Sequence, residues 1–478
     1  MSSAADAATG TAGDTIAPPA AQTPTTTNRR QPYGQGFLDT ISTGWAERTE
    51  PTPVAIAQAP FAAARRDAVS AAFPGRRLVV PAGELKQRSN DTDFPFRAHS
   101  AFSHLTGWAS DAEPGATLVF EPRAHSGHDV TLYFRERADR TTSEFYSDAS
   151  IGEFWIGPRP ALEGVASQLG VQTAHIDDFE SRDGDLVLDE DTDLTRAVSE
   201  LRLVKDAYEI DQMRLAVEVT ARGFDDIVAN LPAIVAHPRG ERLVEGVFHQ
   251  RARSDGNTVG YDTIAASGPH ACYLHWTRND GAVVPGDLIL VDAGAEVDSL
   301  YTADITRTIP VSGRFTDIQR RIYETVREAA DAAFAVARPG ITFRSVHEAA
   351  MQVIATRVAE WGLLPVTAAE ALDAERGGHH RRYMVHGTSH HLGIDVHDCA
   401  QARRDMYYDG LLEPGMVFTI EPGLYFQIDD VTVPEEYRGI GVRIEDDILM
   451  TGDGPVNLSA GIPRTADEVE AWIARLSA

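Results

Sequence analysis

Short apolar runs alternate with helix-like stretches over residues 55–190. The segments 77–80, 116–120 and 130–134 are rich in β-branched and aromatic residues, which is typical of buried strands. Because helical patterns lie between them, we expect an α/β domain over residues 55–190. The acidic run at 183–193 follows this domain, and we expect it to be a solvated connection to the next one.

A different pattern begins near residue 198. Apolar side chains at alternating steps of three and four predict an amphipathic helix carrying Ile210, Met213, Val217, Thr220, Phe224, Ile227 and Leu231. Capping boxes predict the starts of two further helices, at Thr316 with Gln319 and at Ser345 with Glu348. Strands are expected at 288–291, 304–311, 416–421 and 441–450. Helices and strands therefore segregate into an α+β domain over 198–478, with a curved sheet as the floor of a site.

The first 54 residues differ from both domains. Ala, Thr, Gly and Pro dominate them, and such a composition buries too little apolar area to offset the entropy lost on ordering. We expect this N-terminal arm to be disordered. The alternative is an arm that docks on a neighbouring subunit, with Phe37, Leu38 and Trp45 as anchors.

Charge and cysteine content narrow the class of protein. The net charge of −28 argues against a nucleic-acid partner, and such a surface would also be repelled by an anionic membrane. No apolar stretch approaches the length of a membrane-spanning helix, and the N-terminus has no secretory signal pattern. Two cysteines, Cys272 and Cys399, exclude a disulfide framework while leaving one bridge open. We therefore expect a cytoplasmic protein.

Candidate chemistry lies in the last third of the chain. Four carboxylates and one imidazole stand beside Gly, Pro or β-branched residues that can fix their geometry: Asp292, Asp304, His390, Glu421 and Glu445. Hard divalent ions such as manganese prefer a set so rich in oxygen. Taken singly, each residue is more simply explained as a turn, solvated or structural side chain. Together, in one domain, they predict a two-metal hydrolase site.

Strand periodicity supports this interpretation. Arg443, Glu445 and Asp447 would share one face of the 441–450 strand. Asp304, Thr306 and Thr308 would share a face of another strand. Isolated buried carboxylates are costly, so acids that converge on one face must be neutralised or must hold cations.

The ordered strings around these residues resemble the pita-bread metallopeptidase family, which includes methionine aminopeptidase, prolidase and aminopeptidase P. The strings lie at 291–294, 303–308, 386–390, 420–423 and 443–447, with further matches at 260–264 and 274–275. Upstream, 93–97 and 103–108 resemble the N-terminal domain of bacterial aminopeptidase P, which methionine aminopeptidases lack. The resemblance implies a pita-bread (creatinase/aminopeptidase) α+β catalytic domain preceded by an α/β creatinase-like N-terminal domain.

The same resemblance implies two divalent ions per subunit, usually Mn²⁺. Asp292 would bind one ion, His390 and Glu421 the other, and Asp304 and Glu445 would bridge the two. The implied partners are peptides that begin Xaa-Pro, and relatives with this layout are often dimers or tetramers, so a homo-oligomer is expected.

The implied reaction releases the N-terminal residue from peptides with proline in second position, by attack of a hydroxide that bridges the two metals. Glu421 would carry protons. His275, His386 and His397 would contact substrate and stabilise the oxyanion. Tyr425 is a candidate for substrate contact, and Arg443 is expected to position a bridging carboxylate as well as to line the substrate site.

Some features depart from the family pattern. Asp292 and Asp304 are one residue farther apart than in many relatives, and we expect the extra residue in the hairpin at 296–299. His391 stands where Trp is common and Trp276 where Tyr is common, so both are candidates for altered substrate preference.

Three alternatives stay open at this point. Prolidase shares the whole metal set but cleaves only Xaa-Pro dipeptides. A creatinase-type amidinohydrolase uses this fold without metals, and a non-enzymatic binding module would have lost catalysis. Retention of all the predicted ligands argues against the last two.

Overall fold

The computed structural model describes residues 33–49 and 51–477, which form two compact units. The smaller unit comprises 33–49, 86–94 and 138–158. The larger unit comprises 51–85, 95–137 and 159–477, and it contains both the α/β sheet and the predicted catalytic domain.

The smaller unit holds short elements: α1 (Gln35–Ile41), α4 (Glu144–Ser147), α5 (Glu153–Ile156), β2 (Gln87–Ser89) and β3 (Thr92–Asp93). The Phe37 ring lies edge-on to Tyr146 at 5.2 Å, and Trp45 lies edge-on to Phe145 at 5.4 Å. Two anchors predicted for a docking arm thus contact their own chain. Residues 1–32 of that arm lie outside the described residues.

The first part of the larger unit is a mixed five-stranded sheet in the order β6-β5-β4-β1-β7. Its strands are β1 (Leu78–Pro81), β4 (Thr117–Pro122), β5 (His128–Phe134), β6 (Gln172–His175) and β7 (Leu186–Val187). The three strands predicted here are confirmed. Alternate side chains of the three central strands are fully buried, as the period of two requires: Leu78, Val80, Leu118, Phe120, Leu132 and Phe134. They pack with α2 (Ala59–Ala72), α3 (Ser100–Thr106) and α6 (Leu162–Leu169) in one core.

The acidic run ends in α7 (Thr192–Leu201), whose N-cap Asp191 accepts bonds from the backbone of Asp193 and Leu194. Part of the predicted solvated connection is therefore a helix start, where carboxylates are favourable.

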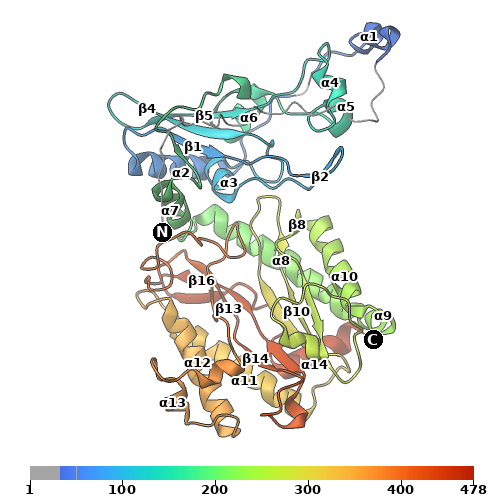
Figure 1. Ribbon diagram of the computed structural model, residues 1–478, viewed down its shortest axis with the longest axis vertical. Helices are drawn as coiled ribbons and strands as arrows, with labels where there is room; N and C mark the ends of the chain where they lie inside the picture. Colours follow the sequence, from blue (N-terminus) through green and yellow to red (C-terminus); the bar gives the residue numbers. More distant parts are fainter. Residues whose placement is uncertain (1–32, 50, 478) are drawn as a thin grey trace, which may run out of the picture. The chain divides into compact units, whose positions relative to one another are not determined.

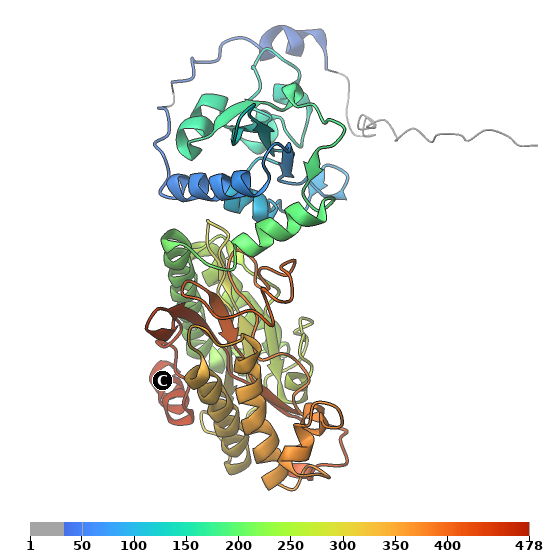
Figure 2. The same cartoon turned by 90° about the vertical axis from the view of Figure 1, so that its left-hand side faces the viewer.

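The predicted amphipathic helix is α8 (Ala207–Ala229), which begins with a capping box of Asp206 and Glu209 and ends before Leu231, the last apolar position predicted for it. It is followed by α9 (Leu231–Ala236), α10 (Gly240–Asp255), α11 (Asp317–Val336), α12 (Arg344–Glu360), α13 (Ala368–Ala371) and α14 (Ala466–Leu476). The pairs α8 with α10 and α11 with α12 lie side by side (Figure 1, Figure 2). None of the described helices is long and apolar enough to span a membrane.

One of the two predicted capping boxes is confirmed. Thr316 and Gln319 cap α11 reciprocally. Ser345 does not cap α12, because that helix already begins at Arg344 and the Ser345 hydroxyl bonds instead to the Thr342 hydroxyl at 2.7 Å.

The strands of this part form four small sheets with the orders β12-β10-β9, β13-β16-β17, β14-β15 and β11-β8. Their bounds are β8 (Thr258–Val259), β9 (Ile264–Ser267), β10 (Leu288–Ala293), β11 (Ala295–Glu296), β12 (Ile305–Pro310), β13 (Val417–Ile420), β14 (Gly423–Phe426), β15 (Ile440–Arg443), β16 (Asp446–Thr451) and β17 (Gly454–Asn457). The predicted strands at 288–291, 304–311 and 416–421 are confirmed to within one or two residues.

The predicted continuous strand at 441–450 is wrong, because the chain is interrupted between β15 and β16. Ile420 pairs with Asp446, and Gly423 pairs with Arg443, so Glu421-Pro422 lies opposite Ile444-Glu445 at the same register. Pro422 has no N–H to donate, which explains why the ladder opens there. The ladder is thus interrupted at the same register on both segments, and we call this interruption the paired break. Each segment has one predicted metal ligand there, Glu421 and Glu445.

Candidate metal centre and active site

All the predicted ligands lie around one cavity of about 500 Å³. Tyr261, His275, His386, His397 and Arg443 line the same cavity. The five ligands come from β10, the residue before β12, the 386–397 segment and the paired break, which are far apart in the sequence.

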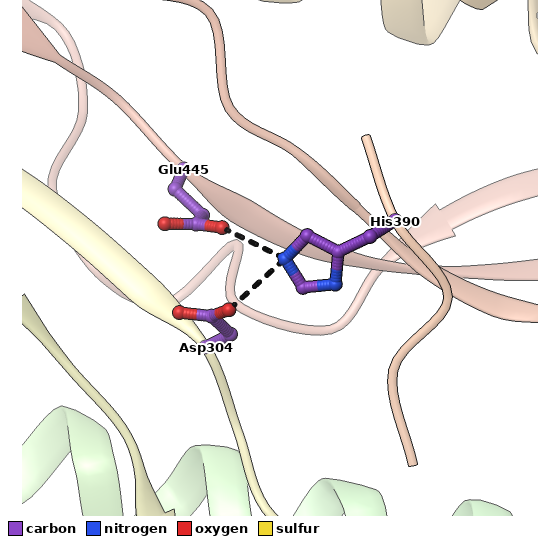
Figure 3. A group of neighbouring side chains, drawn as sticks. All are labelled: Asp304, His390 and Glu445. Carbon is purple, nitrogen blue, oxygen red and sulfur yellow. Dashed lines mark ion pairs between the residues drawn. The ribbon is translucent and has the colours of Figure 1, made fainter. Parts of the chain in front are cut away.

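Asp304, His390 and Glu445 form the tightest cluster (Figure 3). His390 Nε2 lies 3.2 Å from Asp304 Oδ2 and 4.0 Å from Glu445 Oε1. It also lies 3.7 Å from Glu421 Oε1. His390 Nδ1 donates to the backbone carbonyl of His391 at 3.2 Å, which leaves Nε2 as the ring nitrogen that faces the carboxylates.

The electrostatics of this cluster favour a cation at its centre. Burial opposes the protonation of His390, but the hydrogen bond with Asp304 and the charges of Glu421 and Asp304 outweigh it and raise the pKa to about 9. Burial, with the charges of Asp304 and Asp292 acting in the same direction, raises the pKa of Glu421 to about 7. Burial and the other carboxylates likewise raise the pKa of Glu445 well above its usual value.

The donor set therefore fits divalent metal ions. Buried carboxylates this close repel one another unless positive charge lies between them. Oxygen donors with one imidazole suit hard or borderline divalent ions rather than soft ones.

Tyr261 is a residue of this site to which the sequence assigned no role. Its hydroxyl lies 2.6 Å from Asp292 Oδ1 and 2.5 Å from Asp304 Oδ1, so the two carboxylates share its one proton. Burial and the two carboxylates raise its pKa well above 10, so it stays a donor. The turn after β10 brings it close, because a Cβ at Gly294 would lie 1.7 Å from the Ala303 carbonyl and 3.0 Å from the Tyr261 ring.

Arg443 contacts a different carboxylate from the one expected. Its Nη2 pairs with Asp292 Oδ2, whereas the sequence analysis expected a bridging acid. It reaches Glu445 through Thr306, whose hydroxyl accepts from Arg443 Nε at 3.1 Å and donates to Glu445 Oε2 at 2.7 Å. The register explains this geometry, because Asp292 pairs with Thr306 across the sheet.

Tyr425 lies behind the cavity rather than on its wall. It is 5 % exposed, and its hydroxyl bonds to His386 Nε2 at 2.8 Å and to Arg443 Nη1 at 3.1 Å. His386 Nδ1 donates to the Gly387 carbonyl at 2.6 Å, so its Nε2 accepts from Tyr425. Burial, followed by the charge of Arg443, lowers the pKa of His386 to about 3 and keeps the imidazole neutral.

The comparisons with known proteins agree with this geometry. Residues 211–452 match the model of metallopeptidase family M24, and residues 62–193 match the aminopeptidase P N-terminal domain. The chain belongs to metallopeptidase family M24. The predicted fold class, an M24 pita-bread domain after an aminopeptidase P N-terminal domain, is confirmed.

Individual M24 relatives match over most of their length. "Xaa-Pro aminopeptidase 2" of Streptomyces coelicolor is 50% identical over 458 residues, which are 91% of this chain and 96% of the relative. "Xaa-Pro aminopeptidase" of Escherichia coli is 32% identical over 87% of this chain and 98% of the relative. The structure of zinc-substituted E. coli aminopeptidase P in complex with product matches with a TM-score of 0.75 at 30% identity, covering 88% of this chain and 99% of that one.

The two residue replacements that depart from the M24 pattern, Trp276 and His391, do not line the cavity. Trp276 donates to Glu241 at 3.0 Å and stacks on His270. The His391 ring is 1 % exposed, stacks on Phe343 at 4.6 Å and has no hydrogen-bond partner for either nitrogen among the described residues. Neither ring lines the cavity, which argues against an effect on substrate preference.

We expect His391→Phe to raise the free energy of unfolding by about 1 kcal/mol, because it removes two buried polar atoms that lack partners. Chemical denaturation of both proteins measures the difference. His125→Phe, at an exposed position, is the control and should give no gain. A loss of stability in His391→Phe would show that the ring nitrogens are satisfied by buried water.

The cysteines play no part in the cavity. Cys272 and Cys399 are both buried and free, so the bridge left open by the sequence does not form.

Proposed function

We propose that this chain is a dinuclear Xaa-Pro aminopeptidase, which removes the N-terminal residue from peptides with proline in second position. The observation that carries the proposal is the convergence of Asp292, Asp304, His390, Glu421 and Glu445 on one cavity that His275, His386 and His397 also line. Curated relatives with this name, at up to 50% identity over nearly the whole chain, support it.

The metal part of the proposal follows from the donor set. Asp292 would hold one ion, His390 and Glu421 the second, and Asp304 and Glu445 both. Two divalent ions supply a lowered pKa for a shared water and polarise a carbonyl group. We propose manganese as the native metal because four of the five donors are carboxylates.

The protein side chains would have distinct tasks. Glu421 lies 3.6 Å from His386 Nδ1 and 3.7 Å from His390 Nε2, within reach of a water in the cavity, so it can take up a proton and pass it to the leaving nitrogen. His275 and His397 can hydrogen-bond the substrate carbonyl, and the neutral His386 would join them only by releasing the Gly387 carbonyl, to which its single N–H donates. Arg443 and Tyr261, which also line the cavity, hold Asp292 and Asp304 in place.

Hydrolysis of a peptide series by metal-stripped protein tests the function. With manganese added back, we expect cleavage of Xaa-Pro-Yaa peptides between Xaa and Pro, and little cleavage of matched Xaa-Ala-Yaa peptides. Cleavage of Xaa-Pro dipeptides alone would identify a prolidase. Equal activity in the stripped protein would refute the metal-dependent mechanism. No cleavage of any peptide would favour the creatinase-type amidinohydrolase or a binding module, and absence of metal from the purified protein would point to the former.

Two further parts of the proposal concern context. We propose a cytoplasmic protein that assembles as a dimer or tetramer, by analogy with relatives of the same layout. Light scattering of the purified chain measures its mass directly.

A further inference from the structure

His397 lines the cavity but lacks a side-chain anchor. Its ring is exposed, stands edge-on to His390 at 4.4 Å between ring centres, and makes no hydrogen bond to any described residue. It lies in an irregular segment, 393–398, that belongs to no helix or strand. The position of the imidazole therefore depends on what holds this segment.

Two residues of the N-terminal α/β domain hold the segment just before His397. Arg97 Nη2 donates to the Ile394 carbonyl at 2.6 Å. The Ser100 hydroxyl donates to Asp395 Oδ1 at 2.5 Å and accepts from Arg97 Nη1 at 3.1 Å. We call Arg97, Ser100 and Asp395 the clamp. All three lie in the larger compact unit.

Arg97 also connects the clamp to β11, the strand that follows Asp292 in the sequence. Its Nε donates to Glu296 Oε2 at 2.7 Å, and Glu296 lies in β11, four residues after Asp292. One guanidinium group thus joins the His397 segment to the β10–β11 region.

The segment is held on its other side within the catalytic domain. Asp398 is fully buried and pairs with Lys205 and Arg202, each at 3.0 Å. Its backbone N–H donates to the His391 carbonyl at 2.9 Å. The residue after His397 is therefore anchored by a buried ion pair, and the residues before it are anchored by the clamp.

The role of the clamp can be inferred by comparing its expected contribution to stability with its expected effect on turnover. The side chains of Arg97 and Asp395 are 37% and 36% exposed, and ion pairs with such exposure contribute little to stability. Displacement of a substrate-positioning group by about 1 Å, however, can reduce turnover by about 100-fold. The Arg97–Asp395 pair thus adds little to the stability of the fold, although Arg97 also pairs with the buried Glu296 carboxylate, and the Ser100–Asp395 bond is well placed to orient one ring.

We propose that Ser100 and Arg97 are positioning residues for His397, through which the N-terminal domain adjusts turnover. The inference rests on the proposed function, in which His397 contacts the substrate. It assigns a task to Arg97, in the 93–97 string that resembles the aminopeptidase P N-terminal domain, and to Ser100 just after that string, and neither residue lines the cavity.

Single substitutions provide the first test. We expect Ser100→Ala to lower kcat for an Xaa-Pro-Yaa peptide about tenfold, with KM changed less than about twofold, because the ring is misplaced while the metal donors are not. Ser103→Ala, on the same helix α3, is the matched control, since its buried hydroxyl has no hydrogen-bond partner among the described residues. Arg97→Lys should lower kcat by an intermediate amount, because lysine keeps the positive charge but cannot make all the hydrogen bonds of the guanidinium group.

A double-mutant cycle separates positioning from a general structural effect. In the His397→Ala background, Ser100→Ala should lower kcat no further than about twofold, because the ring that it positions is gone. Multiplicative effects, or a Ser100→Ala protein as active as the parent, would overturn the inference. Failure of the proposed function shows itself separately, as a parent protein without peptidase activity or as a fully active His397→Ala protein.

Discussion

Replacement of Glu421 by glutamine is expected to lower kcat about 1000-fold, equivalent to about 4 kcal/mol in the activation barrier. The amide has the size of the carboxylate but cannot take up a proton. Steady-state hydrolysis of an Xaa-Pro-Yaa peptide measures the loss, and metal content determined on the same sample shows how much of it comes from weaker metal binding.

The matched control is Glu413→Gln, an exposed glutamate shortly before β13. It should change kcat less than about twofold. Retention of full activity by Glu421→Gln with normal metal content would refute the proton-transfer role, whatever the peptide cleaved.

Removal of divalent ions is the second change with a large expected effect, and the effect should depend on pH. In the metal-free protein Glu421 has its pKa raised to about 7, and His390 has its pKa raised to about 9. Both folded-state values exceed the unfolded ones. Their stabilising protonation is complete below the unfolded pKa and is lost as the pH rises through the folded pKa.

We therefore expect the metal-free protein to lose stability between pH 5 and pH 9, by an amount on the order of 3 kcal/mol for Glu421 alone. Manganese should restore about 3 to 4 kcal/mol at concentrations far above its dissociation constant, and more at high pH, because metal ions compete with these protons. Thermal unfolding with chelator and with manganese, at several pH values, measures this. A metal-free protein that becomes more stable with rising pH would contradict the assignment of the cluster.

Glu421→Gln is the matched variant for this experiment. It removes one of the titrating groups, so the pH dependence of the metal-free protein should become shallower. Glu413→Gln should leave it unchanged.

Sequence patterns predicted the fold well where one signal dominated. Short apolar runs rich in β-branched and aromatic residues located β1, β4 and β5, and the three-four apolar spacing located α8. The Ser345 capping box was wrong because a local four-residue pattern competed with the Thr342 hydroxyl, which no spacing rule includes. Likewise, alternation over 441–450 looks like one strand, although Pro422 on the opposite arm prevents continuous pairing.

In the candidate site, too, some features could be predicted from the sequence and others could not. The acids and the histidine could be selected from residue type and neighbours. Their supports could be predicted only in part. Arg443 was expected to position a bridging carboxylate, but the register of neighbouring sheets brings it to Asp292, and Tyr261 reaches Asp292 and Asp304 only after β9 and β10 pair. The Gly260-Tyr261-Asp262 string matched the family pattern, but that match did not indicate what Tyr261 does.

The paired break at Glu421-Pro422 and Ile444-Glu445 has a consequence for how this scaffold can diverge. Like charges directly opposite in an antiparallel pair are unfavourable, and here two glutamates face each other at one register. Neutral residues at both positions would relieve that repulsion and leave β13 to β16 intact. Replacement of the two glutamates would therefore cost less stability than disruption of the strand pairing. A protein related to this one could keep the fold and lose hydrolysis through very few substitutions.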